Sequence, residues 1–230
     1  MTTVIAPRYA FLMDARQEML RTRGSGEQQP ARDRIVRSAA ALVRERGVHG
    51  VGLRQIVAHA DGPRGSLQRY FPSGKTQLIT EALNLAGAEV LDDTESGLNE
   101  AATLADAIDA IFAPWRHVLV ESNFTMGCPI AATLIDASGD DRLRQEARAL
   151  LDAWRDSVHA ALVKFGVQQS TAEDDATTLL AALEGALILS RANQSTQPLD
   201  TVQRFFTTSL TQPSANPAAP RHSRVYGTGS

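Results

Sequence analysis

Residues 53–71, LRQIVAHADGPRGSLQRYF, constrain the fold more than any other stretch of the chain. They read as two short helices joined by a turn that contains glycine, which is typical of a helix-turn-helix. In such a motif the second helix is presented to a DNA major groove. Four apolar side chains are expected to hold the two helices together: Leu53, Ile56, Val57 and Leu67. The stretch therefore predicts a DNA-binding unit.

The rest of the chain shows the periodicity of helices. Apolar residues recur every three or four positions, and no segment alternates as a strand would. Besides the helix-turn-helix, this spacing predicts helices at about 31–46, 75–91, 103–120, 130–137, 141–165, 172–193 and 198–211. The acidic segment 92–100, DDTESGLNE, is expected to be a loop. We predict an all-α fold of about nine helices with short connections.

Composition excludes several classes of protein. The chain has 230 residues, of which 43% are hydrophobic and 21% are charged, as in globular proteins. No stretch of 18 apolar residues predicts a membrane span, and the N-terminus lacks the features of a signal peptide. The single cysteine, Cys128, excludes an internal disulfide. We expect a cytoplasmic protein that makes no membrane contact.

Charge is distributed unevenly along the chain. Residues 1–80 hold 13 Arg and Lys against 6 Asp and Glu, a net charge of +7. Residues 81–230 hold 10 against 20, a net charge of −10. A basic N-terminal third that coincides with a helix-turn-helix pattern predicts contact with a polyanion there, and not in the acidic remainder.

The stretch GVHGVGLRQIVAHADGPRGSLQRYFPSGKTQLI resembles the DNA-binding domain of TetR-family regulators. The pieces GPRGSL, FPSGK, GCPIAA and EGALILSRA are similar to the LmrA/YxaF-like branch of that family, and the likeness spans about residues 31–212. It implies a three-helix helix-turn-helix domain followed by a six-helix ligand-binding and dimerisation domain. It also implies a homodimeric transcriptional repressor that a ligand releases from DNA.

The resemblance suggests a division of the chain into four parts. These are a flexible extension at 1–29, a DNA-binding domain at 30–76, a ligand-binding and dimerisation domain at 77–212, and a disordered tail at 213–230. Two positions depart from the family pattern, because Gln68 stands where tyrosine is common and Asp61 stands where the turn usually has glycine. Asp accepts left-handed backbone better than most residues, so we expect the turn to form.

Basic and polar side chains on and beside the second helix are the expected DNA contacts. Arg64 can bind guanine O6 and N7 or clamp a phosphate. Lys75 stands at the start of the next helix, where charge and free N–H groups favour phosphate. The predicted set is Arg54, Gln55, Arg64, Gly65, Ser66, Gln68, Arg69, Tyr70 and Lys75.

The C-terminal helices carry more apolar surface than a DNA-presenting platform needs. We expect part of it to line a cavity for a small apolar or aromatic effector, although the same residues can equally form an ordinary core. The candidate lining is Phe112, Trp115, Leu119, Phe124, Met126, Trp154, Val158, Glu184 and Leu187. Glu184 interrupts the run LEGALIL, and it is expected either to bond within the dimer or to meet the ligand.

Small residues along 174–193 favour close helix packing. We predict that this helix and helix 198–211, each from two copies of the chain, form an isologous four-helix dimer interface. A dimer is also what DNA reading needs, because two half-sites one helical turn apart must be bound together. Double-stranded DNA, a small-molecule effector and a second copy of the chain are thus the expected partners.

Two other functions remain open at this point. Cys128 lies at a Gly-Cys-Pro break where an enzyme nucleophile or a redox sensor is conceivable, but no base stands at a telling spacing. A DNA-binding regulator that responds to no ligand shares the same N-terminal domain. The five histidines are scattered, and no zinc or phosphate-loop motif is present. We therefore predict no catalytic residue, no metal and no cofactor.

Overall fold

The computed structural model describes residues 30–63, 65–137 and 139–211. Within these residues nine helices, α2 to α10, follow one another and no strand occurs, which confirms the predicted all-α class. The proposed extension at 1–29, the proposed tail at 213–230 and Arg64 lie outside the described residues.

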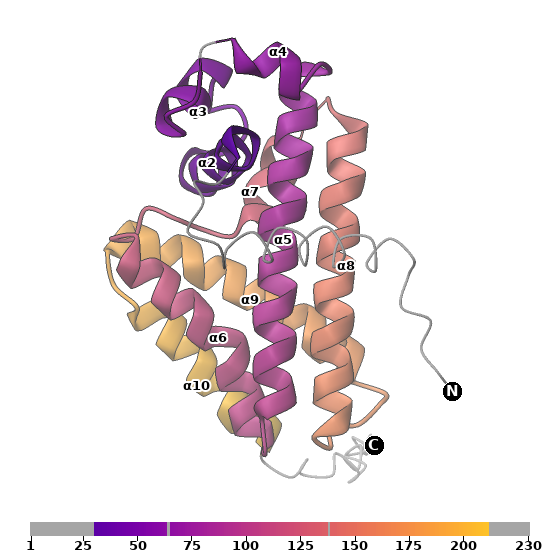
Figure 1. The fold of residues 1–230 in the computed structure, drawn as a ribbon. Helices are drawn as coiled ribbons and strands as arrows, with labels where there is room; N and C mark the ends of the chain where they lie inside the picture. The colour runs from indigo at the N-terminus through magenta and orange to yellow at the C-terminus, as the bar shows by residue number, and fades with distance from the viewer. Residues whose placement is uncertain (1–29, 64, 138, 212–230) are drawn as a thin grey trace, which may run out of the picture.

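The first three helices form a compact head at one end of the molecule (Figure 1). They are α2 (Ala31–Arg46), α3 (Leu53–His59) and α4 (Ser66–Tyr70). Ile35 of α2 and Ile56 of α3 are fully buried, and Phe71, which follows α4, is 2% exposed. Helix α2 ends at Gly47, whose φ of +73° few other residues adopt without strain. The bounds of α2 agree with the helix predicted at 31–46, and α3 and α4 fall within the helix-turn-helix predicted at 53–71.

Helix α5 (Gly74–Glu100) corrects the prediction of a loop at 92–100. The acidic segment is helical because part of it is buried against the neighbouring helices, with Thr94 and Leu98 inside the protein. The indole N–H of Trp154 donates to the Thr94 hydroxyl at 3.1 Å. At Gly97 an added Cβ would lie only 2.8 Å from the Cβ of Ala110, so this glycine permits a close approach of α6. Tertiary packing thus overrides the local polarity.

Five further helices complete the body of the molecule. They are α6 (Leu104–Glu121), α7 (Pro129–Asp136), α8 (Asp141–Lys164), α9 (Ala172–Asn193) and α10 (Gln197–Thr211). Helices α5 and α8 run side by side (Figure 1). Helix α6 packs against α5, α9 packs against α8, and α10 packs against both α6 and α9. Among the described residues no helix has the length and hydropathy to cross a membrane.

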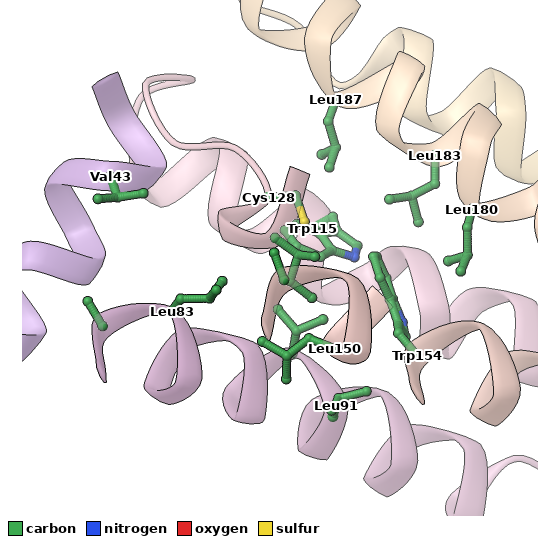
Figure 2. Packing of buried hydrophobic residues seen from close by; sticks show 14 of the residues in the cluster. Val43, Leu83, Leu91, Trp115, Cys128, Leu150, Trp154, Leu180, Leu183 and Leu187 are labelled. Carbon is green, nitrogen blue, oxygen red and sulfur yellow. The ribbon is translucent and has the colours of Figure 1, made fainter. Parts of the chain in front are cut away.

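The core of the body is built around two tryptophans. The rings of Trp115 and Trp154 lie 5.6 Å apart between centroids, and leucines from α5, α8 and α9 surround them (Figure 2). Trp154 is completely buried and Trp115 is nearly so. Helix α5 runs without a break across the predicted domain boundary at 76/77, so the head and the body share one rigid element.

Candidate nucleic-acid interface

The turn between α3 and α4 is tightly held. Asp61 adopts a φ of +48°, which is the left-handed conformation expected at this position of the turn. The N–H of Gly62 donates to the carbonyl of Val57 at 2.9 Å. From α2, Arg34 donates to the carbonyls of Ala60 and Asp61 at 3.2 and 3.3 Å. These bonds satisfy carbonyls at the end of α3 and fix the angle between the two helices.

Four of the predicted contact side chains lie on the surface of this motif. Arg54 and Gln55 on α3, and Gln68 and Arg69 on α4, are all exposed. The side chain of Gln55 accepts a hydrogen bond from the N–H of Gly52 at 2.9 Å, which caps the start of α3. The exposed set combines cationic and amide donors on two adjacent short helices, which suits phosphate and base contacts.

Three other residues predicted to contact DNA instead bond to or pack against the protein's own residues. Ser66 is buried, and its hydroxyl donates to the carbonyl of Pro63 at 2.6 Å. Lys75 is partly buried, and its ammonium donates to the carbonyl of Val48 at 2.8 Å. Tyr70 is half-buried and packs edge-on against Phe71. Gly65 is exposed and has open space around it.

Two arginines tie the head to the body where α2 ends. Arg44 donates from Nε to the carbonyl of Gly127 at 3.2 Å, and the N–H of Gly127 donates back to the carbonyl of Arg44 at 3.1 Å. Arg191 of α9 donates to the carbonyl of Glu45 at 3.1 Å. A guanidinium at a helix C-terminus also interacts favourably with the helix dipole.

Asp136, the last residue of α7, holds the segment between α2 and α3. Its carboxylate accepts from the N–H of His49 at 3.2 Å. A Cβ added to Gly47 would lie only 2.2 Å from the Asp136 carboxylate, so the backbone and the carboxylate are in close contact. The N-terminal part of the head therefore rests on α7 and α9 through polar contacts.

Most of the side chains predicted to line a ligand cavity are packed in the core. Phe112, Leu119, Trp154 and Val158 are fully buried, while Trp115 and Leu187 are 3% and 2% exposed. Figure 2 shows Trp115, Trp154 and Leu187 among the buried hydrophobic side chains. Phe124 and Met126 are partly exposed, in the segment between α6 and α7. Trp115 is the member of the set that borders a cavity of about 190 Å³ at the junction of α2, α5 and α6.

That cavity has charged and apolar walls. Arg44 of α2, Glu89 and Asp93 of α5, and Pro114, Trp115 and Val118 of α6 border it. The guanidinium carbon of Arg44 lies 6.0 Å from the centroid of the Trp115 ring. Burial lowers the pKa of Arg44, and electrostatic interactions with Cys128, Glu89 and Asp93 oppose this shift. No pattern in the sequence indicated that α2 contributes to a cavity.

Glu184 lies beside Cys128. Burial raises the pKa of Glu184 to about 7, although a hydrogen bond with Cys128 acts in the opposite direction, and its Oε1 atom is buried without a partner. Burial also raises the pKa of the Cys128 thiol well above its usual range, as does the charge of Glu184. A buried thiol with a raised pKa is a poor nucleophile. Within the described residues no cluster of His, Cys, Asp and Glu could hold a metal.

Sequence reasoning missed the contacts that position the head. Arg44, Asp136 and Arg191 act on partners 83, 87 and 146 residues away in the chain. Each is an ordinary polar residue in its own helix, so no local motif marks it.

Two family models match the chain. The model described as "Bacterial regulatory proteins, tetR family" covers residues 35–82, which hold the helix-turn-helix. The model described as "Transcriptional regulator LmrA/YxaF-like, C-terminal domain" covers residues 105–205. The two matches fall on the head and on the body.

Individual relatives agree with these matches. The uncharacterized HTH-type transcriptional regulator Rv0196 of Mycobacterium tuberculosis is 37% identical over 183 residues, which is 76% of this chain and 92% of the relative. The HTH-type transcriptional repressor DhaR of Mycobacterium sp. (strain GP1) is 24% identical, over 74% of this chain and 87% of its own. The crystal structure of a TetR transcriptional regulator from Chloroflexus aurantiacus superposes with a TM-score of 0.66 at 27% identity, covering 79% of this chain and 94% of that one.

Proposed function

Because the chain belongs to the TetR family of bacterial transcriptional regulators, in its LmrA/YxaF-like branch, we propose that it is a homodimeric repressor with a palindromic operator. A small apolar or aromatic effector releases it from that operator. The observation that carries the proposal is the exposed set of Arg54, Gln55, Gln68 and Arg69 on the two helices of the helix-turn-helix. The repressor role is supported by the name of the relative DhaR.

An uncovered apolar face supports the dimer. On α9, Ile188 and Leu189 are 61% and 55% exposed, and on α10 Phe205 is 62% exposed. Helices α9 and α10 pack against each other, so these side chains belong to one pair of helices. Exposed large apolar groups on adjacent helices mark an interaction surface. A second copy of the same pair forms a closed, isologous four-helix interface.

Dimerisation explains how a five-residue recognition helix can be specific. Two heads related by a two-fold axis read two half-sites about 34–36 Å apart, so the operator is palindromic. Effector binding then acts by favouring a dimer geometry in which this spacing no longer matches. Since its target is chromosomal DNA, we place the protein in the cytoplasm. Nothing at Cys128 favours catalysis over this function, because its thiol is buried and its pKa is raised.

Selection from random double-stranded DNA with the purified chain tests the proposal. The expected result is a palindromic motif, bound by a dimer at fixed salt. Arg69→Ala should then weaken operator binding by about 1–3 kcal/mol. Arg148→Ala is the matched control, because Arg148 is an exposed arginine further along α8 in the body, and it should leave the affinity within about twofold. Failure to enrich any motif contradicts the proposal.

Repression and release are tested with the operator so obtained. A reporter placed behind it should be expressed less when the chain is present. A screen of aromatic compounds should then find some that dissociate the complex in a gel-shift titration. A reporter that the chain activates would overturn the repressor role, and a complex that no compound affects would favour a regulator without a ligand.

A further inference from the structure

The first turn of α8 lies beside the first turn of α5, at the end of the molecule that carries the recognition helix α4 (Figure 1). The Asp140 carboxylate joins the two turns, because it accepts from the Thr76 hydroxyl at 3.1 Å and from the N–H of Leu143 at 3.0 Å. Thr76 lies six residues beyond Tyr70, the last residue of α4. This part of the body is therefore continuous with the proposed DNA-binding surface.

Several contacts fix the start of α8 beside the head. Leu143 is 2% exposed, and it borders a cavity together with Val48 of the head and Lys75 of α5. Asp136, the last residue of α7, accepts from the N–H of His49 in the head at 3.2 Å. Helices α5, α7 and α8 also pack against one another. The side chains of the first turn of α8 therefore have a defined place relative to α4.

Arginines gather at this end of an otherwise acidic body. Residues 81–230 have a net charge of −10, yet three arginines stand in the first eight residues of α8: Arg142, Arg144 and Arg148. Arg142 and Arg144 are exposed and belong to its first turn. Because side chains lean toward the N-terminus of their helix, these two lean toward the head end. Arg148 stands about 9 Å further along the helix than Arg142, at 1.5 Å per residue.

The carboxylates of this region leave the arginines available to DNA. Asp140 is engaged by Thr76 and by the N–H of Leu143, as described above. Asp141 pairs with Arg144 at 2.6 Å, but the two side chains are 79% and 55% exposed. Exposed ion pairs are weak, so Arg144 can exchange its partner for a phosphate. The acidic groups of the rest of the body act from further away, and charges more than about 10 Å apart are largely screened at 0.1 M salt.

We propose that Arg142 and Arg144 bind phosphates of the DNA backbone beside the half-site that α4 reads. The DNA-binding surface then extends from the head onto the body. Such contacts carry no sequence information, but they set the register of the protein on the duplex. They add to a head in which Lys75, the phosphate contact expected at the start of α5, bonds to the carbonyl of Val48. The inference rests on the proposed function, because it enlarges the same surface.

The salt dependence of operator binding tests the contact at Arg142. Arg142→Gln should weaken binding about threefold to tenfold and make the slope of log K against log salt shallower by about one unit per subunit. Arg142→Lys keeps the charge and should retain the slope. Arg148→Gln is the matched control, because it removes the same charge from an exposed position further along α8, and it should leave the slope unchanged. Equal slopes for Arg142→Gln and the natural chain overturn the contact.

Uncharged phosphates locate the contacts on the DNA. In a series of operator duplexes, one phosphate in each half-site is replaced by a methylphosphonate. At the phosphate that Arg142 binds, the replacement should weaken the natural chain by about threefold or more and should scarcely affect Arg142→Gln, as in a double-mutant cycle. Arg144→Gln should show the same coupling at a neighbouring phosphate, and Arg148→Gln should show none. Coupling at no phosphate for either Arg142 or Arg144 refutes the site.

The outcome is separable from that of the proposed function. Phosphate contacts do not depend on sequence, so Arg142→Gln should also make the salt slope shallower on duplexes of random sequence. A chain that selects an operator, but whose salt slope and phosphate series are indifferent to Arg142 and Arg144, refutes this site and leaves the proposed function intact. A chain that selects no motif, but loses slope on random duplexes in Arg142→Gln and not in Arg148→Gln, supports the site and refutes the proposed function.

Discussion

The head and the body of this molecule are stabilised in different ways. In the head, α3 has seven residues and α4 has five, and isolated helices of this length are marginal in water. They keep their positions partly through polar bonds from neighbouring helices, such as those of Arg34 and Lys75 to backbone carbonyls. In the body, α5, α8 and α9 have 27, 24 and 22 residues and enclose a large apolar core.

This difference bears on how much free energy is needed to change the contacts between head and body. A hydrogen bond contributes about 0.5–1.5 kcal/mol net, so the polar contacts of the head to α7 and α9 together represent only a few kcal/mol. Coupling between two sites in allosteric proteins is commonly about 1–3 kcal/mol. A free energy of that size is enough to change the polar contacts of α2 with α7 and α9, while the apolar core that α2 shares with α5 stays intact.

The largest effect is expected in the body, at Trp154. Replacing this fully buried side chain by alanine removes its packing on Trp115 and its hydrogen bond to Thr94. We expect Trp154→Ala to lower the free energy of unfolding by about 3–5 kcal/mol, as measured by urea denaturation followed by circular dichroism.

Ile135→Ala serves as the control for this prediction. Ile135 is on α7 and is 72% exposed, so its truncation should change the unfolding free energy by less than about 0.5 kcal/mol. Should the two variants be equally stable, the body would not depend on its apolar core in the way described.

The next effect concerns the buried carboxyl group of the body. Burial raises the pKa of Glu184 to about 7 in the folded chain, from 4.5 for an unperturbed glutamate. Because the folded pKa is raised, the favourable contribution of the protonated group is complete below about pH 4.5. It is lost as the pH rises to about 7. Each pKa unit corresponds to about 1.4 kcal/mol, so ionised Glu184 costs on the order of 3 kcal/mol at pH 8.

Glu184→Gln removes this cost because the amide stays neutral. The variant should be more stable than the natural chain at pH 8 by up to about 3 kcal/mol, and the two should converge near pH 4.5. Glu121→Gln is the control, because it makes the same chemical change at an exposed carboxylate on α6. Parallel stability curves for Glu184→Gln and the natural chain would contradict the raised pKa.

The sequence predicted the head more accurately than the body. The spacing of Ile35, Ala39 and Val43 and the turn at Asp61 act locally, so they place α2, α3 and the turn correctly. The C-terminal part of α5 was missed because its helical state depends on burial against α8, which no neighbouring residue indicates. Polar composition predicted a loop there, and tertiary contacts decided otherwise.

The candidate site shows the same limit. Exposure of Arg54 and Arg69 follows from their positions on short amphipathic helices, and the sequence predicted it. The burial of Ser66 results from a bond to Pro63 that depends on the exact turn. The role of Arg44 in a cavity depends on where α2 meets α5 and α6, which is settled only by the assembled fold.

The smallest effect, and the most informative for the contrast between head and body, is expected at Arg191. This residue lies on α9 and donates to the carbonyl of Glu45 at the end of α2. Arg191→Ala should reduce operator affinity by about 0.5–1.5 kcal/mol, because α2 loses one of its contacts with the body. Arg148→Ala on α8, an exposed arginine of the body outside the proposed dimer interface, is the control and should leave the affinity unchanged within twofold.

Salt dependence separates a positioning role for Arg191 from direct contact with DNA. A side chain that binds a phosphate contributes about one unit to the slope of log K against log salt, so its loss makes the slope shallower. Arg191 acts through α2, so Arg191→Ala should lower the affinity at every salt concentration with the slope unchanged. Arg69→Ala, if it removes a phosphate contact, should lower the affinity and also make the slope of log K against log salt shallower. A shallower slope for Arg191→Ala would mean that Arg191 itself binds DNA, and the polar attachment of the head to α9 would then need another explanation.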